Sequence, residues 1–143
     1  MNLRESWLLF AVGSAFFAGL TALFAKLGVA GINSNLATLI RTVVIIAMLA
    51  LIVSLRGEWR PDAPITTRSW VFLILSGVAT GLSWLCYFRA LQLGPISKVA
   101  PIDKLSVAFA IFFGVLFVGE AFSWPVAIGG ALIIAGSVVM IVF

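Results

Sequence analysis

Five apolar runs, each close to twenty residues long, constrain this chain more than any other feature of its sequence. A helix needs about 20 residues to cross the roughly 30 Å hydrocarbon core of a bilayer, and strands of soluble sheets are much shorter. Charged residues, glycines or prolines bound the runs, which cover residues 7–28, 34–55, 69–93, 101–118 and 124–143. We therefore predict an all-α integral membrane protein in which residues 1–143 form one domain of five transmembrane helices.

The composition agrees with a chain that lies in lipid. Hydrophobic residues make up 63% of the 143 positions and charged residues 10%, so there is too little polar surface to coat a soluble globule. Nine Lys and Arg outnumber five Asp and Glu, and in a membrane protein such an excess serves orientation and contact with anionic headgroups. We expect a multi-pass protein of the cell (inner or plasma) membrane that lies in contact with the lipid bilayer and binds no nucleic acid.

The residues that usually carry catalysis are scarce. The chain has no histidine, and its single cysteine, Cys86, has no partner for an internal disulfide or a paired-thiol site. It also has no nucleotide-binding loop and no paired carboxylates within one helix. We therefore predict that the protein is not an enzyme and uses no cofactor and no metal.

The basic residues divide almost evenly between the two expected sides of the membrane. An odd number of spans places the two termini on opposite sides, and the count of Lys and Arg is then four against five. This gives almost no orientation bias, which is compatible with dual topology, whereas clearly hydrated loops alone favour a cytoplasmic N-terminus. The N-terminal side carries Arg4, Arg56, Arg60 and Arg68, and the other side carries Lys26, Arg41, Arg89, Lys98 and Lys104.

The second of these basic sets is expected at one end of the bundle. Lys26 and Arg89 lie close to helix ends, so they either snorkel to the interface or face a cavity. Arg41 lies about two turns inside its helix, which favours a cavity. Together the five basic residues predict a vestibule that attracts an anionic or zwitterionic solute.

The segment "SKVAPIDKLSV" (residues 97–107) brings three charges to the start of the fourth apolar run. Proline is favoured in the first turn of a helix, so we expect Pro101 at the first helical position and Asp103 two residues later. Asp103 would then cap exposed amides, while Lys98 and Lys104 would flank a helix end that favours a carboxylate or phosphate. If the helix instead starts near Ser97, backbone groups are still left free near these charges.

A family resemblance rests on the second half of the chain. The segments "ALQLGPISKVAP", "APIDKLSVAFAIFFGVLFVGE" and "GGALIIAGSVVMI" resemble the repeat unit of EamA-type transporters of the drug/metabolite transporter superfamily. The resemblance covers the whole chain and is most specific over residues 89–137. Family members are typically ten-helix carriers with two five-helix repeats of opposite orientation, and they work by alternating access.

This sequence has one such repeat, so the resemblance implies that an antiparallel homodimer, or a separately encoded paralogous partner, completes the architecture. It also implies that the end of the third helix and the start of the fourth lie near a central cavity. The related small multidrug exporters couple protons through a glutamate in their first helix, but residues 7–25 contain no acid. Asp103 is therefore the candidate proton carrier, as an alternative to its capping role.

Three functions follow as alternatives. The first is a secondary carrier of small metabolites, in which basic residues steer the solute and aromatic side chains form walls. The second is a flippase for an amphiphilic lipid phosphate, and the third is a non-transporting membrane subunit. The candidate substrate-binding residues are Arg41, Trp84, Tyr87, Arg89, Lys98, Asp103 and Lys104.

Overall fold

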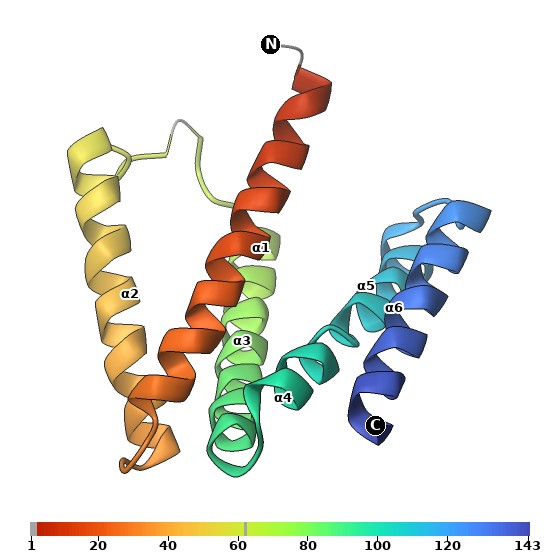
Figure 1. Ribbon diagram of the computed structural model, residues 1–143. Coiled ribbons are helices and arrows are strands. Elements are labelled where there is room, and N and C mark those ends of the chain that lie inside the picture. Colours follow the sequence, from red (N-terminus) through yellow and green to blue (C-terminus); the bar gives the residue numbers. More distant parts are fainter. Residues whose placement is uncertain (1–2, 62) are drawn as a thin grey trace. The chain divides into compact units, whose positions relative to one another are not determined.

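The computed structural model describes residues 3–61 and 63–143, with side chains from residue 7 onward, and every regular element in those ranges is a helix (Figure 1). The helices are α1 (Leu3–Gly28), α2 (Ser34–Arg56), α3 (Thr67–Leu93), α4 (Ile96–Asp103), α5 (Ser106–Phe113), η1 (Gly114–Val118) and α6 (Trp124–Val142). Five stretches are long and apolar enough to cross a membrane: Trp7–Gly28, Ser34–Arg56, Thr67–Leu93, Ile96–Val118 and Trp124–Val142. The prediction of an all-α fold with five transmembrane spans is confirmed.

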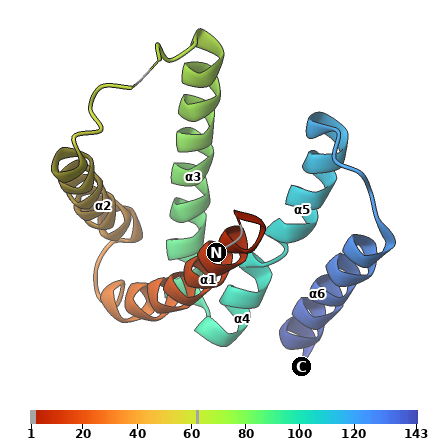
Figure 2. The same cartoon turned by 90° about the horizontal axis from the view of Figure 1, so that it is seen from above.

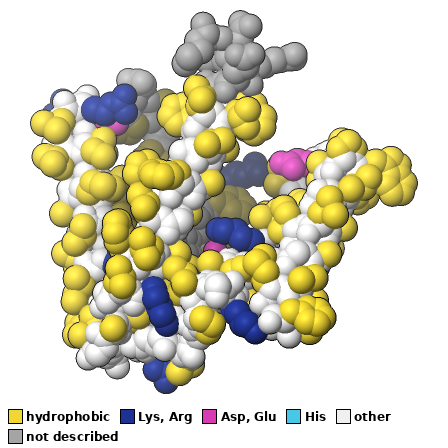
Figure 3. Space-filling model, in the orientation of Figure 1, with side chains coloured by type: hydrophobic (Ala, Val, Ile, Leu, Met, Phe, Trp, Pro, Cys, Tyr) yellow, Lys and Arg dark blue, Asp and Glu magenta, His cyan; other side chains and the backbone are white. Residues whose placement is uncertain are grey.

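The exposed surface of these helices is apolar, as contact with lipid requires. Figure 3 shows hydrophobic side chains along the visible sides of the helices, with Lys and Arg at a few separate places. Large side chains such as Phe10, Leu55 and Phe117 are each more than 70% exposed. A soluble protein rarely exposes so much contiguous apolar surface, so the structure fits a lipid-facing chain.

The chain divides into two compact units, and each is described by itself. The α2–α3 unit comprises Ala25–Gln92, and the α4–α6 unit comprises Met1–Phe24 together with Leu93–Phe143. The prediction that residues 1–143 form a single domain stays a prediction. The side chain of Arg4, which entered the count of basic residues, lies outside the described part of the structure.

The α2–α3 unit has its core where α2 starts and α3 ends. Val29 and Leu91 are 2% and 0% exposed, and Phe88 is 3% exposed. The side chain of Asn33 accepts a hydrogen bond from the backbone N–H of Asn35 at 2.9 Å, and this cap opens α2 at Ser34 as the sequence predicts. The well-packed end of this unit is therefore the end that carries Arg41 and Arg89.

The fourth span is interrupted. Pro95, not Pro101, precedes its first helix, and its carbonyl accepts hydrogen bonds from the N–H groups of Lys98 and Val99, both at 3.1 Å. Pro101 lies inside α4, where it has no N–H to donate to the carbonyl four residues earlier. The helix ends at Asp103, and Lys104 and Leu105 form turns that separate α4 from α5.

The prediction that Pro101 starts the fourth helix is therefore wrong, and the alternative start near Ser97 is close to the observed Ile96. Asp103 ends α4 instead of capping the N-terminus of a helix. The physical reason is that Pro95 holds an extended backbone, with φ −70° and ψ 144°, directly before Ile96, as a residue that precedes a helix does. Across the interruption, hydrogen bonds join residues three apart, including the N–H of Lys104 to the carbonyl of Pro101 at 3.1 Å.

Helix α6 packs against both α4 and α5, and the three lie close together in both views (Figures 1 and 2). A methyl group added at the buried Gly130 of α6 would lie 3.1 Å from Cδ1 of Ile111 in α5, so glycine permits this approach. At the far end of α5, the chain passes through the π-helix η1 and turns at Gly119, whose φ is 75°. Glu120 follows, and its carboxylate lies over Gly114.

Candidate functional site

Arg41 of α2 lies against two aromatic rings of α3. Its Cζ atom is 3.8 Å from the centroid of the Trp84 ring and 5.5 Å from that of Phe88. Arg41 and Trp84 are half-buried, and Phe88 is buried. Tyr87 lies within electrostatic range of the guanidinium. Arg41, Trp84 and Phe88 thus form a cation–π cluster, and two of its members, Arg41 and Trp84, are predicted site residues.

Arg89 is held by a residue that the sequence analysis did not single out. Its Nη1 donates to Oε1 of Gln92 at 3.0 Å. The Nε2 of Gln92 donates to the carbonyl of Ile32 at 2.6 Å and to that of Val29 at 3.3 Å. Gln92 therefore ties Arg89 to the α1–α2 connection. The sequence signal for this contact was an amide side chain, Gln92, one helical turn after Arg89 and close to the "GP" that ends the helix.

Lys26 joins the end of α1 to the end of α3. Its Nζ donates to the carbonyl of Leu91. The carbonyls at the end of a helix have no intrahelical partner and carry the negative end of the helix dipole, so an ammonium group is favoured there. This contact gives Lys26 a structural role in the packed end of the α2–α3 unit.

Lys98 makes a similar contact in the α4–α6 unit. Its Nζ donates to the carbonyl of Ile141, near the end of α6, at 3.1 Å. The residue is exposed, so the ammonium remains accessible. Lys98 therefore also stabilises a helix end, a role that its position in the sequence did not reveal.

Asp103 and Lys104 lie at the interruption of the fourth span. The Nζ of Lys104 is 3.4 Å from Oδ2 of Asp103, and the two side chains are 55% and 38% exposed. A long, partly exposed ion pair contributes little to stability. The two charges are thus loosely paired at the place where the helix backbone is irregular, and irregular backbone at membrane depth occurs where it is buried in protein or lines a cavity.

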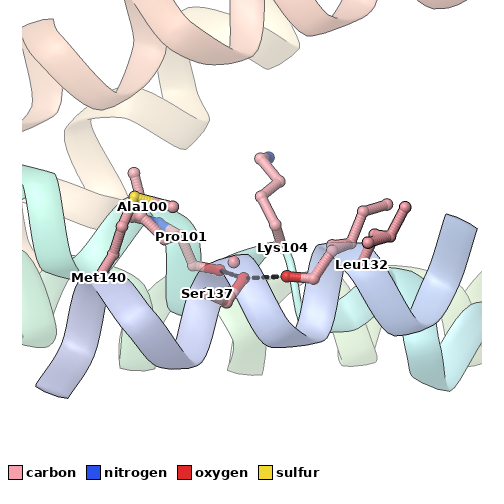
Figure 4. Close-up of a pocket in the computed structure, with 8 residues that line it drawn as sticks. Ala100, Pro101, Lys104, Leu132, Ser137 and Met140 are labelled. Atoms are coloured by element: carbon pink, nitrogen blue, oxygen red, sulfur yellow. Dashed lines mark hydrogen bonds between the residues drawn. The ribbon is translucent and has the colours of Figure 1, made fainter.

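A pocket of about 440 Å³ lies between α4 and α6, next to this interruption. Its walls are mostly apolar, and Lys104 supplies its charge (Figure 4). The hydroxyl of Ser137 lies 3.0 Å from the carbonyl of Pro101 and 2.8 Å from that of Ile133. Because a hydroxyl has one hydrogen, Ser137 donates to one of these carbonyls at a time. The residues labelled in Figure 4 are Ala100, Pro101, Lys104, Leu132, Ser137 and Met140.

The predicted site residues therefore form two groups. Arg41, Trp84, Tyr87 and Arg89 belong to the α2–α3 unit, whereas Lys98, Asp103 and Lys104 belong to the α4–α6 unit. The vestibule that would combine both groups stays a prediction. Within residues 3–61 and 63–143, no group of three or more His, Cys, Asp or Glu side chains is arranged to hold a metal ion.

Comparison with known proteins places the chain among transporters. Residues 5–142 match the model of the EamA-like transporter family. A protein of Sinorhizobium sp., named "Uncharacterized transporter in cobO 3'region", is 53% identical over 141 residues, an alignment that covers 99% of this chain and 100% of the relative. No solved structure matches the chain significantly. Both matches support a transport role in a membrane.

Proposed function

The chain belongs to the EamA-like transporter family, and from this premise we propose that it is a secondary carrier of small metabolites, with a preference for anionic or zwitterionic solutes. Alternating access by a dimer is the proposed mechanism, in the inner or plasma membrane. The family and the five spans account for a multi-pass transporter. The preference for negative charge is a separate step, argued below.

The observation that carries this preference is the stacking of Arg41 on Trp84. Arg41 lies seven residues after the first residue of α2, about 10 Å along the helix. An ionisable group at such depth is costly and usually marks a solute or ion path. Stacking engages the face of the guanidinium, whereas its five N–H donors lie in its plane and match carboxylate or phosphate. Arg41 is thus oriented by Trp84 and still able to bind an anion.

The remaining candidates have supporting roles in this proposal. Arg89 and Tyr87 lie near the same end of α3, and Lys98 and Lys104 add positive charge in the other unit. Asp103 serves as the proton carrier if transport is coupled to protons. Its loose pairing with Lys104 leaves the carboxylate partly exposed, which proton exchange requires.

The proposal is tested by uptake into proteoliposomes that contain the purified full chain. The probes are radiolabelled pyruvate and benzoate as anions, alanine as a zwitterion and choline as a cation. We expect uptake of an anion or zwitterion, no uptake of choline, and at least about a tenfold loss in Arg41→Gln, the size of one lost charge-assisted contact. Arg41→Lys keeps the charge without the planar donors and should be intermediate.

Arg68→Gln is the matched control, because the Cζ of Arg68 lies 5.8 Å from the Phe72 ring at the opposite end of α3. It should transport like the original protein. Choline uptake that survives Arg41→Gln would contradict the anion preference. Absence of uptake for the whole panel, in vesicles that contain folded protein, would favour the non-transporting subunit.

For the assembly we propose an antiparallel homodimer, with a paralogous partner as the alternative. The near-even division of basic residues supports insertion in both orientations. Fusing the C-terminus to one reporter active only in the cytoplasm, and to another active only outside it, tests this. Comparable signals from both are expected, and a signal from one reporter alone would rule out the antiparallel homodimer.

A further inference from the structure

The pocket between α4 and α6 has one cationic side chain and apolar walls, and the space between these walls is called the trough below. Leu132, Ile133 and Met140 of α6 form one wall, and Ala100 and Pro101 of α4 form the other. Its volume of about 440 Å³ falls within the range of roughly 300–1,000 Å³ that small-molecule sites usually have. Apolar walls favour a hydrocarbon group. In a membrane, however, they do not distinguish the hydrocarbon group of a solute from the acyl chain of a surrounding lipid.

Lys104 supplies the selectivity that the walls lack. In Figure 4 its aliphatic stem stands beside the trough, and Nζ lies at the outer end, away from α6. Within the described part of the chain, the polar contact of Nζ is the loose one to Asp103 at 3.4 Å. An ammonium group has three N–H donors, so this contact leaves it able to bind an incoming anion.

The position of Lys104 along the span distinguishes a solute from surrounding lipid. Lys104 directly follows α4, whose eight residues from Ile96 to Asp103 rise about 12 Å from the start of the fourth span. Phosphates of bulk lipids stay in the headgroup region outside the hydrocarbon core. A molecule that contacts Lys104 while its alkyl chain lies in the pocket therefore needs both an anionic head and an apolar chain.

We infer that this pocket binds a single-chain amphiphile with an anionic head, a carboxylate or a phosphate, whose head contacts Lys104 and whose alkyl chain lies between α4 and α6. This inference rests on the proposed function in that it assigns a solute class to a carrier. It narrows the solutes of that function from anionic or zwitterionic metabolites to anions with an apolar part.

Two residues of α6, Ser137 and Gly136, shape this pocket. When the hydroxyl of Ser137 donates to the carbonyl of Pro101, it joins α6 to α4 beside the pocket. Gly136 forms part of its floor, and a Cβ added there would meet nothing within 4 Å. A large side chain at this position would therefore extend into open space and fill the pocket.

The test uses the full chain in nanodiscs of phosphatidylcholine and a dodecyl phosphate that carries a photoactivatable diazirine in its chain. After irradiation, labelled peptides are mapped and quantified. We expect labelling around residues 100–104 and 132–140, displaced by unlabelled dodecyl phosphate or laurate. Dodecyltrimethylammonium, which has the same chain and the opposite charge, and inorganic phosphate, which has no chain, should each fail to displace it.

Matched variants separate charge from volume. Lys104→Gln should lower labelling about tenfold, as expected for a lost charge-assisted hydrogen bond, and Lys104→Arg should retain most of it. Gly136→Leu should abolish labelling by filling the trough. Gly129→Leu is its control, because Gly129 lies on the same helix, also has nothing within 4 Å of an added Cβ, and does not line the pocket.

Several results would overturn the inference. Displacement by dodecyltrimethylammonium would show a site for lipid tails, and displacement by inorganic phosphate would show a site for anions alone. Labelling that is equal in Gly136→Leu and Gly129→Leu would place the probe elsewhere. Binding is measured without transport, so uptake of pyruvate by a chain that does not bind dodecyl phosphate contradicts this inference alone. Binding without uptake of any probe contradicts the proposed carrier alone.

Discussion

Each unit of the molecule contains a lysine that donates to a carbonyl near the end of another helix, but the surroundings of the two contacts differ. Lys26 contacts Leu91, which is fully buried in the packed end of the α2–α3 unit. Lys98 contacts Ile141 in the α4–α6 unit and is itself exposed. In both contacts an ammonium group lies at the negative end of a helix dipole. Side-chain packing around it decides how firmly each helix end is held.

The backbones of the two units also differ, because the helices of the α2–α3 unit are the more regular ones. α2 and α3 are continuous helices of 23 and 27 residues, whereas the fourth span is divided into α4, α5 and η1. Arg41 therefore lies on a rigid helix and is oriented by the rings of Trp84 and Phe88. Asp103 and Lys104 lie where the helix of the fourth span is interrupted. One unit presents a cation on a continuous helix, and the other presents charges at a helix interruption.

The largest expected loss of stability comes from a substitution in the packed end of the α2–α3 unit. Leu91→Ala removes a side chain that is 0% exposed, and loss of its contacts should lower the free energy of unfolding by about 2 to 4 kcal/mol. Leu93→Ala, at a position that is 74% exposed, is the control and should change it little. Unfolding by SDS in mixed micelles measures both. Equal losses in the two variants would contradict the assigned core.

Smaller losses of stability are expected when each of the two lysine contacts is removed, and their sizes can be compared directly. Lys26→Met should lower the free energy of unfolding by about 1 to 2 kcal/mol, because it leaves the carbonyl of Leu91 without its charged donor in a buried setting. Lys98→Met should lower it less, because the side chain that it replaces is exposed. The same titration in SDS decides the order. A larger loss for Lys98→Met would reverse the comparison drawn between the units.

The smallest effect concerns the contact beside the interruption. Ser137→Ala should cost about 1 kcal/mol or less, because the carbonyl of Pro101 also accepts from the N–H of Lys104. Amide hydrogen exchange of residues 102–108 should nevertheless become faster, since the hydroxyl no longer holds α4 against α6. Ser106→Ala, at an exposed position in α5, is the control. Unchanged exchange in Ser137→Ala would show that Ser137 does not hold this junction.

The sequence by itself determined the five spans and most of their bounds. In lipid, each backbone N–H and C=O must be satisfied within the segment, so an apolar run of about 20 residues has to form a helix. The predicted runs also started at the residues where α2 and α6 begin, Ser34 and Trp124. The family resemblance was likewise readable from the chain, and the match over residues 5–142 confirms it.

Only the tertiary structure decided which partner each charged or polar side chain has. The rings beside Arg41, the carbonyl bound by Lys98 and the two carbonyls bound by Gln92 all come from segments more than 40 residues away. Periodicity and capping rules describe neighbours within about one helical turn, so they do not report such contacts. The same limit applies to the start of the fourth span: local chemistry allows a helix to begin at either Pro95 or Pro101, and in the structure α4 begins directly after Pro95.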